Sequence, residues 1–324
     1  MERTTLGIKG PEVTVLGLGC MYFGWREPEK NSLERLDQYI KAGGNFLDTA
    51  NIYAEHWLPD KDYFGKDKAQ FRDGGSERLM GQWLKGRSDR EHLVIASKVG
   101  FPYPDVEAGT SAYRIRSECE KSLKRLGVDY LDLYYLHNDD RDTPLQESLA
   151  ALNQLVREGL VKAIGASNFQ SWRLAQAIAL SRQNGWAEYC CVQQRYSYLR
   201  GKPGADFGAQ LEATPDLMDF CESERVTPIA YSPLLGGAYT DPKKSFSAQY
   251  QGSDSDARLL AMDKVAQAHG ATRNQVVYAW MLQSKPQVLP LVASSTAEQF
   301  REALGALELK LTDDEMAALN AAGA

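Results

Sequence analysis

The feature that most constrains the fold is an alternation of two patterns along the whole chain. Apolar runs of strand length alternate with segments whose apolar residues recur every three or four positions. The runs that we interpret as strands number eight: Val13–Gly19, Asn45–Ala50, Leu93–Gly100, Leu131–His137, Val161–Asn168, Tyr189–Arg195, Val226–Pro233 and Gln287–Ala293. Continuously apolar runs are typical of parallel strands that are covered on both faces. Eight strand-then-helix units predict an α/β fold, the (β/α)8 barrel.

The segments between the runs carry start and stop signals for helices. Thr143-Pro144-Leu145-Gln146 combines an N-cap, a proline at the first helical position and a capping-box glutamine. Helices are predicted from Asn31 to Gly43, from Leu145 to Gly159, and over residues 111–127, 170–185, 214–224, 256–270 and 296–307. The opening segment, from Thr4 to Pro11, is expected to form a small hairpin.

A doubly wound sheet is the rival fold, and it usually carries a G-x-G-x-x-G fingerprint after its first strand. Here the chain reads Gly17-Leu18-Gly19-Cys20-Met21-Tyr22, so tyrosine stands in place of the third glycine. No low-complexity linker divides the 324 residues. We therefore predict one barrel domain over residues 1–324, with long loops over residues 54–75, 197–213 and 235–256 around the mouth at the C-terminal ends of the strands.

Charge and cysteine content exclude several classes of function. The 37 Lys and Arg residues against 43 Asp and Glu leave a net charge of −6, which argues against a nucleic-acid partner. No apolar stretch approaches the ~20 residues of a membrane span, and we expect no signal peptide, because the first eleven residues lack an apolar h-region. Five cysteines without C-x-x-C spacing fit a reducing cytosol. The sequence predicts a cytoplasmic protein, and the widely spaced His56, His92 and His269 predict no metal site.

Polar side chains end the apolar runs, at the positions where a barrel holds its chemistry. They are Asp48, Lys98, His137, Ser167, Asn168, Gln193, Tyr231, Ser232 and Ser294. A single buried charge of this kind can be a local salt bridge, because burial is costly unless the charge is paired. Several charges and polar groups that converge on one mouth indicate a functional site instead.

Three of these groups, Asp48, Lys98 and His137, suggest a proton donor together with Tyr53, which lies five residues after Asp48. A free tyrosine has a pKa of ~10, which a neighbouring ammonium lowers, while a carboxylate holds that ammonium in place. A histidine beside them would orient a substrate oxygen by a hydrogen bond. Such an assembly protonates the alkoxide that develops on a carbonyl carbon. It requires a hydride source, hence a nicotinamide cofactor.

A series of short motifs runs along the chain in a set order. They are Leu16-Gly17-Leu18-Gly19 with Gly24, Asn45-Phe46-Leu47-Asp48-Thr49-Ala50 with Tyr53, Gly75-Ser76-Glu77, Ser97-Lys98, Asp129-Tyr130-Leu131-Asp132-Leu133-Tyr134-Tyr135-Leu136-His137, Ile164-Gly165-Ala166-Ser167-Asn168 and Ala230-Tyr231-Ser232-Pro233-Leu234. In this order and spacing the chain resembles the aldo-keto reductase superfamily over nearly its whole length. The resemblance implies a (β/α)8 barrel that binds NAD(P)H without a Rossmann domain.

The resemblance also implies roles for particular residues. The catalytic tetrad would be Asp48, Tyr53, Lys98 and His137. Tyr231 would stack on the nicotinamide ring, and Ser167, Asn168 and Gln193 would bind its carboxamide. The remaining cofactor contacts would be Gly19, Cys20, Met21, Asp48, Ser232, Leu234, Ser294, Thr296 and Gln299. We expect substrate contacts at Trp25, Trp57 and Asn138, although the two tryptophans would equally suit packing under a loop.

The eighth strand–helix unit departs from the family pattern. Ala293, Gln299 and Ala303 stand where many NADPH-preferring relatives carry Lys or Arg for the 2′-phosphate and Asn for the adenine. Residues 294–296 still precede a predicted helix, whose N-terminus attracts anions, and Arg301 is nearby. We predict NADPH as the cofactor, with NADH as the alternative.

These observations predict an NAD(P)H-dependent reductase of a small-molecule aldehyde or ketone, with Tyr53 as the general acid. Polar residues at the mouth suggest a sugar or another polyhydroxy carbonyl as substrate. Two alternatives remain: a cofactor-binding sensor or accessory subunit on the same fold, and a dehydrogenase that oxidises an alcohol or sugar. The sequence predicts no oligomeric state.

Overall fold

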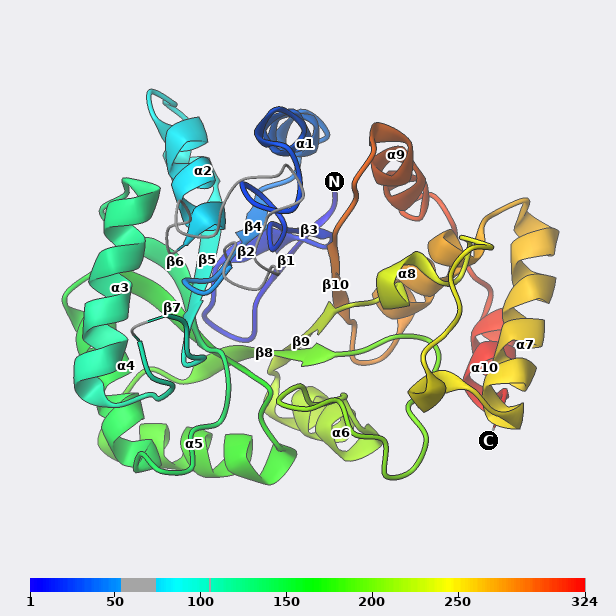
Figure 1. Cartoon of the computed structure of the whole chain (residues 1–324). Coiled ribbons are helices and arrows are strands. Elements are labelled where there is room, and N and C mark those ends of the chain that lie inside the picture. Colours follow the sequence, from blue (N-terminus) through cyan, green and yellow to red (C-terminus); the bar gives the residue numbers. More distant parts are fainter. Residues whose placement is uncertain (54–73, 105, 324) are drawn as a thin grey trace.

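The computed structural model of the protein describes residues 1–53, 74–104 and 106–323. In these parts of the chain, eight parallel strands close into a barrel with helices around it (Figure 1). The barrel strands are β3 (Gly17–Gly19), β4 (Phe46–Asp48), β5 (Val94–Val99), β6 (Leu131–Leu136), β7 (Val161–Ser167), β8 (Tyr189–Arg195), β9 (Thr227–Tyr231) and β10 (Leu289–Val292). Closure is complete because β10 pairs with both β3 and β9. The predicted (β/α)8 fold is confirmed.

A hairpin of β1 (Arg3–Thr5) and β2 (Glu12–Thr14) precedes the barrel. The expected hairpin is therefore present, but the first predicted strand is divided, because Val13 and Thr14 pair with β1 and the barrel strand starts at Gly17. The Thr14 amide donates to Asn45 Oδ1 at 2.7 Å, which turns the chain between the two strands. Val13 packs with the side chains that fill the barrel, and the hairpin thereby covers one of its ends.

The helices are α1 (Glu29–Lys41), α2 (Gly75–Leu84), α3 (Ala112–Leu126), α4 (Leu145–Arg157), α5 (Ser171–Asn184), α6 (Pro215–Glu224), α7 (Ser253–His269), α8 (Arg273–Gln283), α9 (Ala297–Gly305) and α10 (Asp313–Ala321). All seven predicted helices are present, with ends shifted by up to three residues. The prediction that Thr143 caps α4 is wrong: Pro144 is the N-cap, and the Thr143 hydroxyl donates to Asp140 Oδ2 at 2.6 Å.

Three helices, α2, α8 and α10, were not predicted. Most side chains of α8 are buried, so it lacks the polar face on which an amphipathic pattern depends. The helix α10 begins with a capping box of Thr312 and Glu315, a signal that the sequence does contain. The helix α3, which was predicted, shows how local chemistry sets its ends, because Ser111 caps it and Gly127 ends it in the left-handed conformation.

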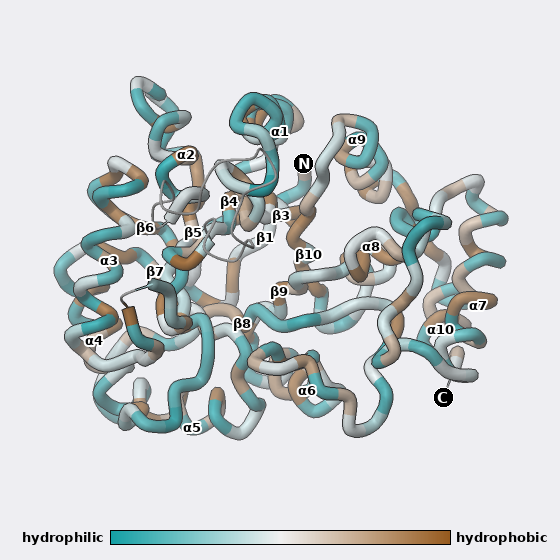
Figure 2. The backbone as a smooth tube through the Cα atoms, viewed as in Figure 1, coloured by the Kyte–Doolittle hydropathy of each residue, from teal (hydrophilic) through white to brown (hydrophobic). Residues whose placement is uncertain are grey.

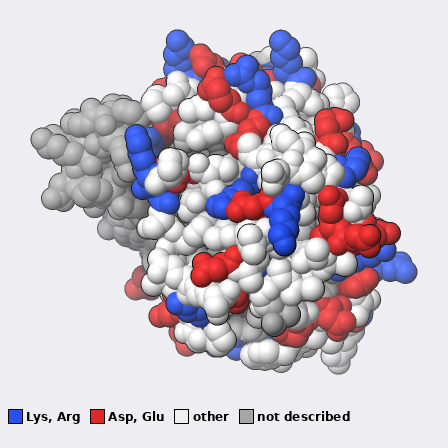
Figure 3. Space-filling model, turned by 90° about the vertical axis from the view of Figure 1, so that its right-hand side faces the viewer, with Lys and Arg blue, Asp and Glu red and all other residues white. Residues whose placement is uncertain are grey.

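Apolar residues are concentrated between the strands and the surrounding helices (Figure 2). Two loops that follow strands pack against each other: the Tyr239 hydroxyl lies 2.7 Å from Ser197 Oγ and accepts from the Leu199 amide at 2.9 Å. Short 3₁₀ turns lie at Arg90–His92, Leu235–Gly237 and Ala248–Tyr250. On the face that carries α7 and α10, acidic and basic side chains are interspersed (Figure 3). No helix in the described ranges is long and apolar enough to cross a membrane.

Candidate active site

The four groups of the predicted tetrad lie together at the C-terminal ends of adjacent strands. Asp48 is the last residue of β4, Lys98 lies near the end of β5 and His137 directly follows β6. Tyr53 comes five residues after Asp48, in a turn that its own amide closes on the Ala50 carbonyl at 3.2 Å. Parallel pairing of β4 with β5 and of β5 with β6 brings these strand ends to one edge.

The ammonium of Lys98 is the centre of this cluster. Its three donors go to Asp48 Oδ1, to the Thr49 carbonyl at 2.8 Å and to the Tyr53 hydroxyl at 3.2 Å. The second carboxylate oxygen of Asp48 accepts from Gln193 Nε2 at 2.8 Å. Lys98 is 0% exposed and Asp48 2% exposed, so the pair is shielded from water. The donors of the ammonium and both carboxylate oxygens thus have partners before any ligand binds.

Opposing effects set the charge of the pair. Burial alone would lower the pKa of Lys98, but Asp48 and Tyr53 together raise that pKa above its ordinary value. Burial raises the pKa of Asp48, against the lowering effects of Lys98 and Gln193. The raised pKa of Lys98 keeps the ammonium charged at neutral pH, and the ammonium can then act on the neighbouring tyrosine.

The pKa of Tyr53 shifts in the direction opposite to the one expected from the sequence. Lys98 does lower the pKa of Tyr53, as predicted, but burial raises it further, and Asp48 adds to the increase. The net result is a pKa above the ordinary value of a phenol, so the side chain keeps its proton at neutral pH. A protonated phenol beside an ammonium suits a proton donor whose conjugate base is stabilised in place.

His137 faces Tyr53 and a neighbouring aromatic side chain. Its ring is edge-on to that of Tyr53, with centroids 5.7 Å apart, and to that of Phe101 at 4.7 Å. Burial, with a smaller effect of Lys98, lowers the pKa of His137 well below its ordinary range, so the imidazole is neutral. Its Nδ1 has no hydrogen-bond partner among the described residues. A neutral imidazole offers one N–H to a ligand oxygen.

Polar residues expected to hold a nicotinamide carboxamide lie at the ends of β7, β8 and β9. Asn168 Nδ2 donates to the His137 carbonyl at 2.9 Å, and Asn168 Oδ1 accepts from the Tyr231 hydroxyl at 2.7 Å. Ser167 Oγ accepts a further bond from Asn168, and Gln193 is bonded to Asp48. The amide, hydroxyl and phenol groups thus converge next to the tetrad, and their chemistry fits a planar carboxamide.

Asn168 and Ser232 share an unusual backbone conformation directly after their strands. Their φ angles are 58° and 54°, in the left-handed region that non-glycine residues rarely adopt. Such residues cluster at ligand sites, where the surrounding structure holds them. Ser232 and Leu234 are partly buried at this end of β9.

The segment after β3 completes this side of the mouth. Gly19 ends β3, and the Cys20 amide donates to the Asp48 carbonyl at 2.8 Å. Burial raises the pKa of the Cys20 thiol well above its ordinary value, so the thiol is unreactive. Met21 packs against the small cluster that contains Tyr53 and Tyr103.

The remaining predicted cofactor contacts lie where β10 leads into α9. Thr296 caps α9 by accepting from the Gln299 amide at 3.2 Å, and Gln299 Oε1 accepts from the Ser295 amide at 2.8 Å. These side chains therefore occupy amides that were expected to attract an anion. Arg301 donates to Glu298 at 2.8 Å on the surface.

Two buried charged residues lie beside this turn. Arg35 is 3% exposed, and its Nε donates to the Ser294 carbonyl at 3.3 Å. Glu27 interacts electrostatically with Arg35, and burial raises the pKa of Glu27 to about 7. Glu27 Oε1 and Ser294 Oγ are buried without partners in the described structure. We call Glu27, Arg35, Ser294, Thr296 and Gln299 the β10–α9 region.

The three predicted substrate contacts lie in different surroundings. Trp25 is buried, and its Nε1 donates to the Met21 carbonyl at 2.5 Å. Asn138 follows His137 and fits closely against Gly100, where an added Cβ would lie 2.2 Å from Asn138 Oδ1. Trp57 lies outside the described residues.

Sequence reasoning missed a layer of residues behind the tetrad. Ser76 donates to the Cys20 carbonyl at 2.7 Å, and its amide donates to the Tyr53 carbonyl at 3.0 Å. Glu77 accepts from Ser97 at 2.6 Å and from Arg125 at 2.5 Å. The motif Gly75-Ser76-Glu77 in the sequence was a signal for Ser76 and Glu77. Glu118, which bonds to the turn before Tyr53, gave no signal in the sequence.

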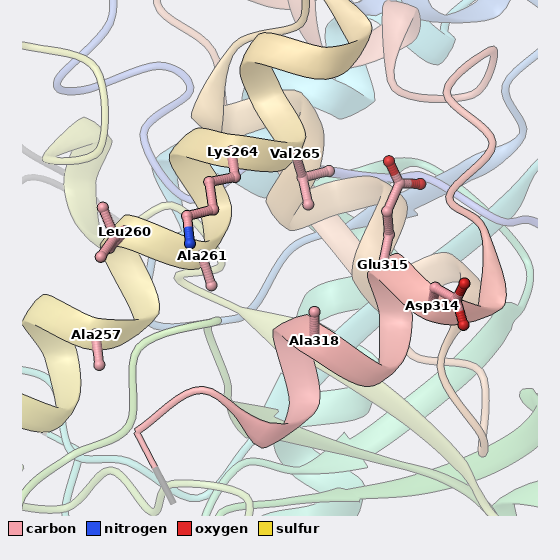
Figure 4. A pocket seen from close by; sticks show the side chains of 8 residues that line it. All are labelled: Ala257, Leu260, Ala261, Lys264, Val265, Asp314, Glu315 and Ala318. Atoms are coloured by element: carbon pink, nitrogen blue, oxygen red, sulfur yellow. The ribbon is translucent and has the colours of Figure 1, made fainter.

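A separate groove lies between α7 and α10, with a volume of about 490 Å³ (Figure 4). It is lined by Ala257, Leu260, Ala261, Lys264, Val265, Asp314, Glu315 and Ala318. None of the polar strand-end residues contributes to it. The described residues contain no group of three His, Cys, Asp or Glu side chains placed to hold a metal ion.

Known protein sequences are similar to this chain over nearly its whole length. The model of the Aldo/keto reductase family matches residues 15–324. The chain is similar to the "Uncharacterized oxidoreductase YrpG" of Bacillus subtilis (strain 168), with 32% identity over 334 residues that cover 99% of this chain and 95% of the relative. It is also similar to the "Norsolorinic acid reductase stcV" of Emericella nidulans, with 27% identity over 97% of this chain and 79% of the relative.

A solved structure extends the likeness to three dimensions. It is that of the thermostable aldo-keto reductase Tm1743 in complex with the inhibitor epalrestat. The two chains share 31% identity, each is covered to 99%, and the TM-score is 0.73. The family match and the structural likeness therefore span nearly the whole chain, as the ordered motifs do.

Proposed function

The chain belongs to the aldo/keto reductase family and is an oxidoreductase, and on that premise we propose that it reduces an aldehyde or ketone to the alcohol with NAD(P)H. Aldo-keto reductases generally use this cofactor. The observation that carries the proposal is the buried contact of the Lys98 ammonium with both Asp48 and the Tyr53 hydroxyl.

In the proposed mechanism, Tyr53 gives its proton to the carbonyl oxygen as negative charge develops there. When bound, NAD(P)H supplies the hydride that forms the new C–H bond. Lys98 stabilises the resulting phenolate, which solvent reprotonates, and Asp48 keeps the ammonium charged and in position. The neutral His137 donates a hydrogen bond to the same oxygen and orients it.

The residues proposed to hold the cofactor come from the ends of five strands, β3, β7, β8, β9 and β10, and from the segments that follow them. Ser167, Asn168 and Gln193 would bind the carboxamide, and Tyr231 would stack on the ring. The backbone of residues 19–21, with Ser232 and Leu234, would line the remaining part, and Ser294, Thr296 and Gln299 would lie toward the adenosine. We propose NADPH over NADH, supported by the buried cation Arg35 and the unpartnered hydroxyl of Ser294.

Two substrate classes are favoured by different observations. Asn138, Asp139 and Asp140 follow His137 and would suit a sugar or another polyhydroxy carbonyl. Phe101, edge-on to His137, and the buried Tyr103 would suit an aromatic ketone, and one relative is named as a reductase of norsolorinic acid. Five buried thiols, all unpaired, support a reducing compartment, the cytosol, as the site of action.

The test is oxidation of NADPH and NADH against a panel of sugar aldehydes and aromatic ketones. We expect turnover by the wild type and a loss of about 10²- to 10⁴-fold in kcat for Tyr53→Phe, with cofactor affinity retained. Tyr113→Phe, at a tyrosine that is 82% exposed, is the matched control.

Full activity of Tyr53→Phe would refute the mechanism. Tight cofactor binding without turnover on the whole panel would favour a sensor or accessory subunit. Oxidation of alcohols or sugars with NADP⁺, and no reduction of the panel, would assign the reverse direction.

A further inference from the structure

Glu118 is a buried carboxylate that the proposed mechanism does not use. It lies on α3, its side chain is 2% exposed, and it accepts three hydrogen bonds. Oε2 accepts from Asn51 Nδ2 and from the Tyr103 hydroxyl, both at 2.8 Å, while Oε1 accepts from Lys121 at 2.7 Å. Although burial raises the pKa of Glu118, these three bonds outweigh it and bring the pKa below its ordinary value.

The bond to Asn51 reaches the turn that carries the proposed proton donor. Asn51 lies two residues before Tyr53 and is 1% exposed. The backbone amide of Asn51 donates to the Lys98 carbonyl at 3.3 Å. The backbone amide of Tyr53 donates to the Ala50 carbonyl and so closes the turn. Glu118 therefore fixes the side chain of a residue whose backbone already touches β5. The turn cannot shift without breaking a buried, charge-assisted hydrogen bond.

The bond to Tyr103 reaches a second segment of the site, the one that follows β5. Tyr103 packs in one cluster with Tyr53 and Ile52. Two residues before it, Phe101 lies edge-on to the His137 ring with centroids 4.7 Å apart. One carboxylate oxygen thus holds both the segment of the acid and the segment beside the orienting histidine.

We propose that Glu118 is a positioning residue for the reaction: its Oε2 joins the turn of Tyr53 to the segment of Phe101 and Tyr103, and so sets the phenol against Lys98 and His137. The inference rests on the proposed function for its kinetic consequence. Its geometric consequence, a turn at residues 49–53 that is held from α3, is independent of the reaction. Neither Glu118 nor Asn51 touches the atoms that react.

The two oxygens of Glu118 allow the role to be separated from its charge. In Glu118→Gln, the amide oxygen can still accept from Asn51 and Tyr103, and only the bond to Lys121 is lost. Glu118→Leu removes all three bonds. Lys121→Met removes the ion pair alone, and Glu120→Gln changes an exposed carboxylate on the same helix as a control. Tyr103→Phe and Asn51→Ala each break one bond in case Glu118→Leu does not fold.

We expect Glu118→Leu to lower kcat by about 10²-fold, the scale of a misplaced reacting group, with cofactor affinity unchanged. Glu118→Gln and Lys121→Met should keep most of the activity. The alkaline limb of kcat should move to higher pH in Glu118→Leu, because Lys98 then lowers the pKa of Tyr53 less effectively. Hydrogen exchange of peptides that cover residues 49–53 should become faster in the same variant.

Three results would overturn the inference. One is wild-type kcat in Glu118→Leu, or in both single-bond variants, while Tyr53→Phe is inactive. Another is an equal loss in Glu118→Gln and Glu118→Leu. If the wild type turns over no substrate, the proposed function fails instead, and unchanged hydrogen exchange at residues 49–53 in Glu118→Leu would then reject the positioning role on its own.

Discussion

The Lys98–Asp48 pair of the tetrad and the β10–α9 region lie at the same mouth of the barrel, yet their buried polar groups differ in whether they have hydrogen-bond partners. In the tetrad, the donors of Lys98 and both carboxylate oxygens of Asp48 have partners. In the β10–α9 region, one oxygen of Glu27 and the hydroxyl of Ser294 are buried without partners in the described structure. The Lys98–Asp48 pair is complete as a hydrogen-bonded unit, whereas the β10–α9 region and His137 Nδ1 keep buried polar atoms without partners among the described residues.

The contrast separates chemistry from recognition. A reacting group must be held before the substrate arrives, because reorganisation during the reaction raises the barrier. Groups that contact a ligand can instead remain unsatisfied in the free protein, at a cost in stability. We therefore expect changes in the tetrad to remove stabilising contacts, and some changes in the β10–α9 region to relieve a penalty.

Lys98→Met should have the largest effect on stability. It leaves the Asp48 carboxylate buried beside an apolar side chain, which costs about 3–5 kcal/mol when one partner of a buried pair is removed. Urea unfolding of wild type and variant measures the loss. Lys30→Met, in an exposed pair with Glu34, should change little. A loss below ~1 kcal/mol for Lys98→Met would show that the two sites do not differ in this way.

Glu27→Gln should stabilise the protein at neutral pH. Glu27 titrates near pH 4.5 in the unfolded chain, whereas burial raises its pKa to about 7 in the folded chain. Stability therefore falls as pH rises from about 4.5 to 7, because only the unfolded state releases the proton in that window. The variant should gain up to about 3 kcal/mol at pH 8 and almost nothing at pH 4.5.

Parallel urea titrations at these two pH values test the gain. The exposed Glu29→Gln is the matched control on the same segment. A gain for Glu27→Gln that is equal at both pH values, or a loss at pH 8, would mean that the Glu27 carboxylate is not a source of strain in the free protein.

Thr296→Ala should cost about 1 kcal/mol, the usual contribution of an N-cap side chain. The Thr296 hydroxyl accepts from the Gln299 amide and so satisfies one free donor of α9. Thr312→Ala, at the matching cap of α10, should cost a similar amount. A much smaller loss at Thr296, measured by urea unfolding, would indicate that this amide is free for a ligand.

Arg301→Ala should have the smallest effect. Arg301 is exposed and paired with Glu298, so it should contribute roughly 0–1 kcal/mol to any affinity. The ratio of dissociation constants for NADPH and NADH should therefore stay nearly unchanged, whereas Ser294→Ala should weaken NADPH binding by about 1 kcal/mol. A large loss of NADPH preference in Arg301→Ala would place the 2′-phosphate on the surface of α9 instead.

Much of the fold was predictable because its signals are local. Each barrel strand is an apolar run. Because a parallel strand is stabilised by burial of both its faces, the run itself predicts the strand. The division of the first run was not predictable, because it depends on a bond from the Thr14 amide to Asn45, 31 residues away. The helix α8 was not predicted for a related reason: it is buried on most sides, so its sequence lacks an amphipathic pattern.

The sequence by itself determined the eight-unit barrel and the four polar groups at its strand ends, because an apolar run that stops at a charged residue marks both the strand and its mouth. Only the tertiary structure decided how those groups behave. Burial reverses the expected shift of Tyr53, and Asp48 gains a partner from Gln193, 145 residues away. Glu118 acquires its contacts from two other segments. Burial and long-range hydrogen bonds depend on distances in space, which no local pattern of residues records.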